Sequence, residues 1–184
     1  MKKLFKKNNN GFTLVETLVA LSIFTASVLA MLIILSQGLT QTSFAKNKLV
    51  ATYLAQEGIE YFRNTRDNHM LYGTNGWDTF QKVLDQKCSQ AEGCGFIDLS
   101  FPFDVNNDVF SCIDKNNCEL GLLEGKYSSL NFNPQTGNID SGFRRVINTI
   151  SYNKDTIHIL STVYWYQSSV EHSVSFSEDL FNWY

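Results

Sequence analysis

One apolar run dominates the N-terminal part of the chain. It extends from Phe12 to Leu35, and Glu16 is its only charged residue. In a helix, a run of this length can cross a hydrocarbon layer of about 30 Å. A charge at mid-membrane costs roughly 2.5–3.5 kcal/mol even on a lenient scale, so a charged residue there is a candidate functional residue. The pattern therefore predicts a membrane-spanning helix in which the Glu16 carboxylate needs a partner.

A second apolar pattern continues the run at helical spacing. The segment 45–62 contains no proline, and its large apolar residues recur with a period typical of one helix face: Leu49, Val50, Tyr53, Leu54, Tyr61 and Phe62. We expect this stripe to pack on a globular domain, with Gly58 weakening the helix by about 1 kcal/mol relative to alanine. A continuous helix from Thr13 to Arg66, rising about 1.5 Å per residue, would be a rod of about 80 Å. The alternative is an anchor helix and a separate domain helix that meet near Gly38.

Beyond Asn68 the pattern changes to the short alternating runs of β-structure. Strands are expected at 127–132, 143–152, 157–166 and 170–176, with turns at 133–138, 153–155 and 167–169. The strand 157–166 alternates most clearly, with one face formed by Ile157, Ile159, Ser161, Val163 and Trp165. The segment 77–85 fits a short helix or a strand, and 180–184 is expected to pack the C-terminus against the sheet. The chain is thus predicted to be an α+β protein, with a long N-terminal helix packed on an antiparallel sheet.

Two groups of side chains in the predicted sheet are interpreted as structural. Tyr164, Trp165 and Tyr166 have sheet spacing and are expected to build core. Arg144 and Arg145 begin a strand and are expected to lie at a surface edge.

The charge distribution orients the predicted membrane helix. Four lysines precede the apolar run within the segment 1–11, and only Lys46 and Lys48 follow it closely. By the positive-inside rule, the N-terminus lies in the cytoplasm and everything after about Gly38 lies on the far side. The formal net charge is −3, and loss of the four lysines of 1–11 would make it about −7. Such an acidic exported part lacks the basic patch typical of a nucleic-acid-binding surface, so no nucleic-acid partner is expected.

Three interpretations of the N-terminus are open on the pattern alone. The first is a signal-anchor helix in which Thr13 and Glu16 form an ordinary capping box. The second is a secretory signal peptide cut after 36–38, although its apolar part exceeds the usual ~7–15 residues and Glu16 is awkward there. The third is a leader that is cut on the cytoplasmic side directly after Gly11, with the apolar segment kept as an assembly helix.

The four cysteines, Cys88, Cys94, Cys112 and Cys118, lie in an irregular region on the predicted exported side. Four cysteines allow three disulfide connectivities. The two equal Cys-x5-Cys spacings favour Cys88–Cys94 and Cys112–Cys118, while a crossed arrangement stays open. Disulfides are favoured over zinc, because structural zinc sites prefer two to four intervening residues and the exported side is oxidising.

No motif indicates catalysis, a cofactor or a metal site. The segment 104–108 resembles the start of a calcium loop, but an EF-hand needs glycine at its sixth position and glutamate at its twelfth. Val109 and Lys115 occupy those positions, so we interpret the segment as a solvated turn. The three histidines show no metal-ligand spacing, and there is neither a nucleophile motif nor a glycine-rich phosphate loop.

Residues 11–16, Gly-Phe-Thr-Leu-Val-Glu, resemble the N-terminus of type IV pilins and type II secretion pseudopilins. The family pattern is a basic leader, a glycine, an aromatic or other apolar residue, then Thr-Leu-x-Glu and an apolar helix. The resemblance implies that prepilin peptidase cleaves between Gly11 and Phe12 and methylates the new amine of Phe12. It also implies that Glu16 is the assembly glutamate, whose carboxylate pairs with an N-terminal amine of its own or a neighbouring subunit and sets the register of assembly.

One departure from the abundant shaft pilins and one further resemblance point to a minor pilin or pilus modification protein. Major pilins usually carry a proline about two-thirds along the apolar run, and this run has none. The segments 55–60 and 163–183 also resemble minor pilins, although less specifically. The alternatives are a pseudopilin of a type II secretion or DNA-uptake system, and a membrane-anchored extracytoplasmic adhesive or binding module.

The resemblance implies a non-enzymatic, pilin-like filament subunit in four parts. These are a basic leader at 1–11 that is removed, a transmembrane and assembly helix at 12–38, its amphipathic continuation at 39–66, and an extracytoplasmic head at 67–184. The implied partners are other pilin subunits, prepilin peptidase, the inner-membrane pilus assembly machinery and membrane lipid. The expected location is a single-pass membrane protein that enters a surface pilus or a pseudopilus.

Overall fold

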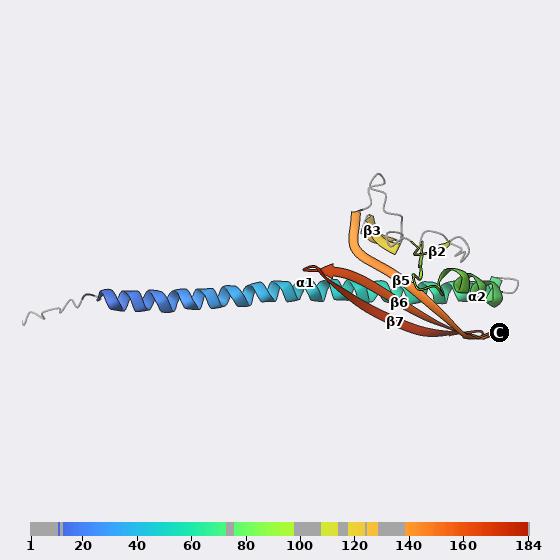
Figure 1. Ribbon diagram of the computed structural model, residues 1–184, viewed down its shortest axis with the longest axis horizontal. Coiled ribbons are helices and arrows are strands. Elements are labelled where there is room, and N and C mark those ends of the chain that lie inside the picture. Colours follow the sequence, from blue (N-terminus) through green and yellow to red (C-terminus); the bar gives the residue numbers. More distant parts are fainter. Residues whose placement is uncertain are drawn as a thin grey trace, which may run out of the picture. The chain divides into compact units, whose positions relative to one another are not determined.

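The computed structural model describes residues 11, 13–72, 76–97, 108–113, 118–123, 125–128 and 139–183. Phe12, the segment 104–107 and the expected turn at 133–138 lie outside this part of the chain. The chain divides into two units, Met1–Ala45 and Lys46–Tyr184. In chain order, the elements are α1 (Leu14–Tyr72), α2 (Gly76–Lys87), β1 (Cys94–Phe96), β2 (Val109–Ser111), β3 (Glu119–Leu123), β4 (Lys126–Ser128), β5 (Ile139–Asn153), β6 (Thr156–Gln167) and β7 (Val170–Phe181) (Figure 1).

The helix α1 begins at Leu14, continues through Gly38 and ends at Tyr72, six residues beyond the expected Arg66. Proline is absent from this whole segment, so no residue removes a helical hydrogen bond. The segment 77–85, for which the sequence allowed either a helix or a strand, lies in the short helix α2. The α+β class and the long N-terminal helix packed on an antiparallel sheet are confirmed.

Within the described residues, all seven strands join one antiparallel sheet. The long strand β5 is central. Along one of its edges it pairs with β6, and β6 pairs with β7. Along its other edge β5 pairs with β1 and with β3; β1 in turn pairs with β2, and β3 pairs with β4. The turn between β6 and β7 has positive φ at both central residues, 51° at Ser168 and 65° at Ser169. Two such residues are typical of the two-residue hairpin turns that match the twist of the strands. β7 extends to Phe181, so residues 180–181 continue the sheet rather than pack on it.

The strand β6 confirms the alternation expected from the sequence. Its inward positions are all buried, namely Ile157, Ile159, Ser161, Val163 and Trp165. On the opposite face Tyr166 is 68% exposed, so the expectation that it builds core is wrong, and Tyr164 is half-buried. The difference follows from strand geometry, because neighbours in sequence point to opposite faces and α1 covers only one of them.

The buried face of α1 matches the predicted stripe only in part, at Leu54, Tyr61 and Phe62. Leu49 and Tyr53 are more than half exposed, whereas the buried positions, apart from Tyr61, are Ala51, Leu54, Ala55, Gly58, Ile59, Phe62 and Thr65. The reason is that the backbone of α1 lies close to the sheet at Gly58. A Cβ atom at Gly58 would lie 2.5 Å from Ser161 Oγ and 3.0 Å from Ile147 Cδ1. The contact therefore requires a small residue at Gly58, and the large residues Leu54, Ile59 and Phe62 complete the buried face.

Two disulfides, Cys88–Cys94 and Cys112–Cys118, fasten the short strands to the rest of the head. The first joins the end of α2 to β1, and the second joins the segments after β2 and before β3. These are the pairings that the equal spacings favour. All four cysteines are buried, and Cys88 and Cys94 belong to the main core with Phe62 and Phe96.

Candidate functional site

The first turn of α1 begins at Leu14, two residues after Phe12. Thr13 is the N-cap residue, because its hydroxyl accepts a hydrogen bond from the Glu16 backbone N–H at 3.3 Å. The Thr13 carbonyl accepts the first helical bond, from the Thr17 N–H at 3.2 Å. Gly11 is exposed and has open space where a Cβ would be. A helix thus starts immediately after the Gly11–Phe12 peptide bond, which itself lies partly outside the described residues.

Glu16 lies in this first turn, at the third helical position. Its side chain is exposed, and within the described residues its carboxylate has no hydrogen bond or ion pair. The unpaired N–H groups at the helix start give this end a partial positive charge, which favours a nearby carboxylate by about 0.3–1 kcal/mol. That gain is smaller than the roughly 2.5–3.5 kcal/mol that a charge costs inside lipid. A positively charged group from outside α1's described residues is therefore needed to pair Glu16 in an apolar environment.

The helix that follows can cross a membrane by its length and composition. No side chain in its most apolar stretch is buried, which distinguishes it from the core helix of a globular domain. Its hydroxyls bond to the helix backbone, as in Ser22 to the Val19 carbonyl at 2.7 Å and Ser27 to the Ile23 carbonyl at 2.8 Å. Hydroxyls satisfied in this way can lie in lipid or against another apolar helix without an unpaired polar group.

The comparison with family models matches residues 6–33 to the prokaryotic N-terminal methylation motif. The matched segment includes the junction 11–16 and most of the apolar run. The N-terminal segment is a prepilin signal. No significant match was found among curated proteins or solved structures.

The prepilin signal implies processing by prepilin peptidase and assembly with other pilins. It relates three features of the structure to one another: the exposed Gly11, the capped start of α1, and the Glu16 carboxylate, which has no partner within the described residues. Cleavage between Gly11 and Phe12, methylation of Phe12 and the assembly role of Glu16 stay predictions for this chain.

A buried arginine of the sheet, Arg145, binds the C-terminal part of α1 to the globular head. Arg145 of β5 is only 2% exposed, so the expectation that it lies at a surface edge is wrong. Its Nη1 donates to Glu57 Oε2 at 2.7 Å and to the Leu54 carbonyl at 3.2 Å, and its guanidinium lies 4.0 Å from the Phe96 ring centroid. One side chain of the sheet therefore binds two residues of α1 and an aromatic ring of β1.

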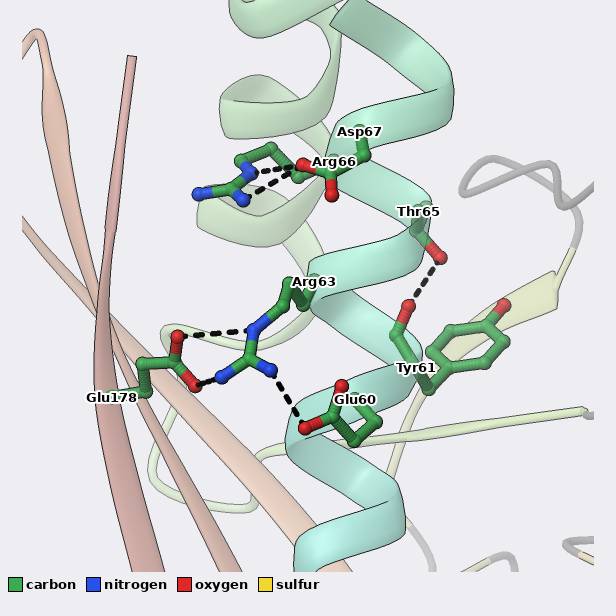
Figure 2. Close-up of polar contacts among 7 residues, drawn as sticks. All are labelled: Glu60, Tyr61, Arg63, Thr65, Arg66, Asp67 and Glu178. Carbon is green, nitrogen blue, oxygen red and sulfur yellow. Dashed lines mark hydrogen bonds and ion pairs between the residues drawn. The ribbon is translucent and has the colours of Figure 1, made fainter. Parts of the chain in front are cut away.

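A second set of polar contacts, shown in Figure 2, fastens α1 to the last strand. Arg63 donates from two guanidinium nitrogens to the Glu178 carboxylate of β7, with Nε 3.2 Å from Oε1, and from Nη1 to Glu60 at 2.7 Å. The hydrogen bond to Glu178 raises the pKa of the Arg63 guanidinium above its already high ordinary value, so Arg63 stays protonated at physiological pH. One turn further along, Arg66 bonds to Asp67 and lies 5.8 Å from the Trp183 ring centroid. Arg63 thus binds the last strand, and Arg66 contacts the segment that follows it.

Sequence reasoning missed Arg145 and its partner Glu57 as contact residues. The signal that was present is the pair of adjacent arginines at 144 and 145. Because successive strand residues point to opposite faces, one of the two had to face whatever covers the sheet. The carboxylate at Glu57, on the helix predicted to cover it, was the matching partner.

Proposed function

We propose that this protein is a minor subunit of a type IV pilus or a pseudopilus, anchored in the membrane and assembled into a filament through α1. The prepilin signal at residues 6–33 is the observation that carries the proposal. The leader lysines put the N-terminus in the cytoplasm and the head outside, where its disulfides persist. The inner-membrane assembly machinery and membrane lipid are the further partners proposed.

The proposed role of Glu16 is to set the register of assembly. Cleavage after Gly11 would create an ammonium group on Phe12, close to the first turn of the helix. In a bundle of parallel helices, the Glu16 carboxylate of one subunit would pair with the amine of a neighbour. Both charges lie in an apolar environment, so a subunit docked at the wrong axial offset would leave them unpaired. Pairing thus favours one offset.

The continuous helix supports a minor rather than a major subunit. α1 shows no interruption between Leu14 and Tyr72, and the segment lacks the proline usual in major pilins. A proline would remove one backbone hydrogen bond and allow the helix to kink or open locally. The proposed subunit keeps all of these bonds.

Mass spectrometry of the mature protein tests the processing step. We expect a chain that begins with N-methylated Phe12. An intact Met1 would contradict the proposal, and so would a chain that begins near Leu39, since that start would indicate an ordinary secretory signal peptide.

The substitutions Glu16→Ala and Glu16→Gln test the assembly step. Both should leave the protein in the membrane fraction and remove it from sheared surface filaments, because neither side chain can pair with an amine as an anion. Glu92→Ala is the matched control, since Glu92 is an exposed carboxylate of the head. Normal incorporation of both Glu16 variants would show that the carboxylate does not set register here.

A further inference from the structure

The sheet face opposite α1 carries a hollow of about 120 Å³ that the prepilin signal does not explain. Side chains from β3, β5 and β6 line it: Glu119, Asp140, Arg144, Tyr164 and Tyr166, together with Gly142. The strand register accounts for this grouping, because Glu119, Arg144 and Tyr164 are direct neighbours across the three strands. Arg145, which contacts α1, points to the other face, so the hollow is separate from the helix contact.

Gly142 forms the floor of the hollow. Its φ is +74°, a conformation that disfavours any larger residue, and there is open space where a Cβ would be. The Gly142 N–H donates to Asp140 Oδ1 at 2.8 Å, which fixes this carboxylate at the rim. The missing side chain leaves a gap in an otherwise continuous face of side chains.

One wall of the hollow already holds a cation. The Arg144 guanidinium lies 4.3 Å from the Tyr164 ring centroid and 3.6 Å from the Glu171 carboxylate. Glu171 also accepts a hydrogen bond from the Tyr166 hydroxyl, and this bond raises the pKa of Tyr166. Here the Tyr164 ring and the Glu171 carboxylate together bind the Arg144 guanidinium.

The remaining lining residues offer the same chemistry without an internal cation. Glu119 and Asp140 lie at the rim, Tyr166 is 68% exposed, and within the described residues the Glu119 carboxylate has no hydrogen bond or ion pair. The lining contains two carboxylates and one guanidinium, and Glu171 beside Arg144 adds a third carboxylate, so the region has a net negative charge. Aromatic ring faces and carboxylates both attract cations, and a planar guanidinium binds carboxylates through two parallel hydrogen bonds.

We propose that this hollow binds the basic side chain of a partner protein, with arginine preferred over lysine. Pockets for whole small molecules usually have volumes of about 300–1,000 Å³, whereas a hollow near 120 Å³ accommodates the end of a side chain. The guest guanidinium would lie against the Tyr166 ring and between the carboxylates of Glu119 and Asp140. This inference concerns the face away from α1 and does not depend on filament assembly.

A titration of the full-length protein in detergent micelles at low salt tests the proposal. The tyrosine rings are labelled with ¹³C, and their signals are assigned with single Tyr→Phe variants. Nα-acetyl-arginine amide is the probe, and Nα-acetyl-citrulline amide, which is neutral and nearly isosteric, is its control. We expect saturable shifts of the Tyr164 and Tyr166 signals with the arginine probe alone. The absence of saturable shifts, or equal shifts with citrulline, would overturn the proposal.

Substitutions at the rim identify the binding groups. The double variant Glu119→Gln, Asp140→Asn should weaken binding of the arginine probe about tenfold, because two charge-assisted hydrogen bonds become neutral ones. Asp179→Asn is the matched control, since Asp179 is a carboxylate on the same sheet face that bonds to His158 instead. If the double variant does not fold, Glu119→Gln alone carries the test. Unchanged affinity in the folded variant would show that the hollow is not the site.

Discussion

Two adjacent arginines have opposite environments. Arg145 is buried and binds α1, whereas Arg144 lies on the outer face with a partly exposed side chain. A buried guanidinium is tolerated only when its charge and its donors are satisfied. For Arg145, the Glu57 carboxylate balances the charge, and the Leu54 carbonyl and the Phe96 ring are further contacts of the guanidinium.

The substitution Arg145→Met should lower the free energy of unfolding by about 2–3 kcal/mol, because it removes two hydrogen bonds and the ring contact while keeping most of the apolar volume. The loss stays below the 3–5 kcal/mol typical of a broken buried pair because Glu57 is 39% exposed and is solvated when left alone. Denaturant unfolding followed by near-UV circular dichroism measures it.

Arg144→Met is the matched control, and we expect it to change the free energy of unfolding by less than about 1 kcal/mol, as for exposed ion pairs. Equal losses for the two variants would mean that Arg145 does not hold the helix on the sheet. The sequence showed that two charges begin a strand but not which one is buried. That depends on which face α1 covers, and the register of β5 against the other elements decides it.

At the scale of elements, the packing of α1 on the sheet rests on small residues. Ala51, Ala55 and Gly58 are spaced three or four residues apart and let the helix backbone approach β6 closely. The period of the helix and the alternation of β6 were both predictable, because each is a local property of the chain. The contact stripe itself was predicted only in part: Leu54, Tyr61 and Phe62 are buried, whereas Leu49 and Tyr53 are exposed, and the small contact residues were not predicted.

Gly58→Ala should destabilise the head by about 1–3 kcal/mol. Alanine favours the helix by about 1 kcal/mol, but its Cβ would lie 2.5 Å from Ser161 Oγ, and the packed sheet must shift. The change is measured as the midpoint of thermal unfolding of the full-length protein in micelles.

Gly38→Ala provides the matched control for this position. Gly38 belongs to the same helix but has no atom within 4 Å of an added Cβ, so the head should unfold at an unchanged or slightly higher temperature. A stabilising effect of Gly58→Ala would contradict the close contact between α1 and β6.

At the scale of the whole molecule, all of the buried core belongs to the unit Lys46–Tyr184. The first buried residue along the described chain is Ala51, whereas the large apolar residues between Leu14 and Leu39 are exposed. A chain that starts at Lys46 should therefore fold as a soluble domain with both disulfides. Size-exclusion chromatography, near-UV circular dichroism and disulfide mapping check this. Aggregation, or loss of cooperative unfolding, would show that the N-terminal unit contributes to the core.

The sequence predicted the features of the N-terminal segment far better than those of the head. The junction 11–16 and the apolar run are contiguous in the chain, so their chemistry can be interpreted directly. The hollow at Gly142 could not be predicted, because Glu119, Arg144 and Tyr164 meet only through the pairing of three strands. The register between β3 and β5 also shifts between Leu120 and Gly121, which sequence periodicity does not indicate.

The ion pair between Arg63 and Glu178 has a consequence for the solubility of the protein. β7 is twelve residues long, and within the described sheet it pairs only with β6, so its outer edge offers backbone groups to another strand. Long open edges of this kind are starting points for aggregation, and an inward-pointing charge is one way that proteins prevent it. Glu178 is such a charge, on the helix-facing side between Phe176 and Leu180. A foreign strand added there would have to pack beside a carboxylate already bound to Arg63, so this charge protects the open edge of β7 from pairing with another chain.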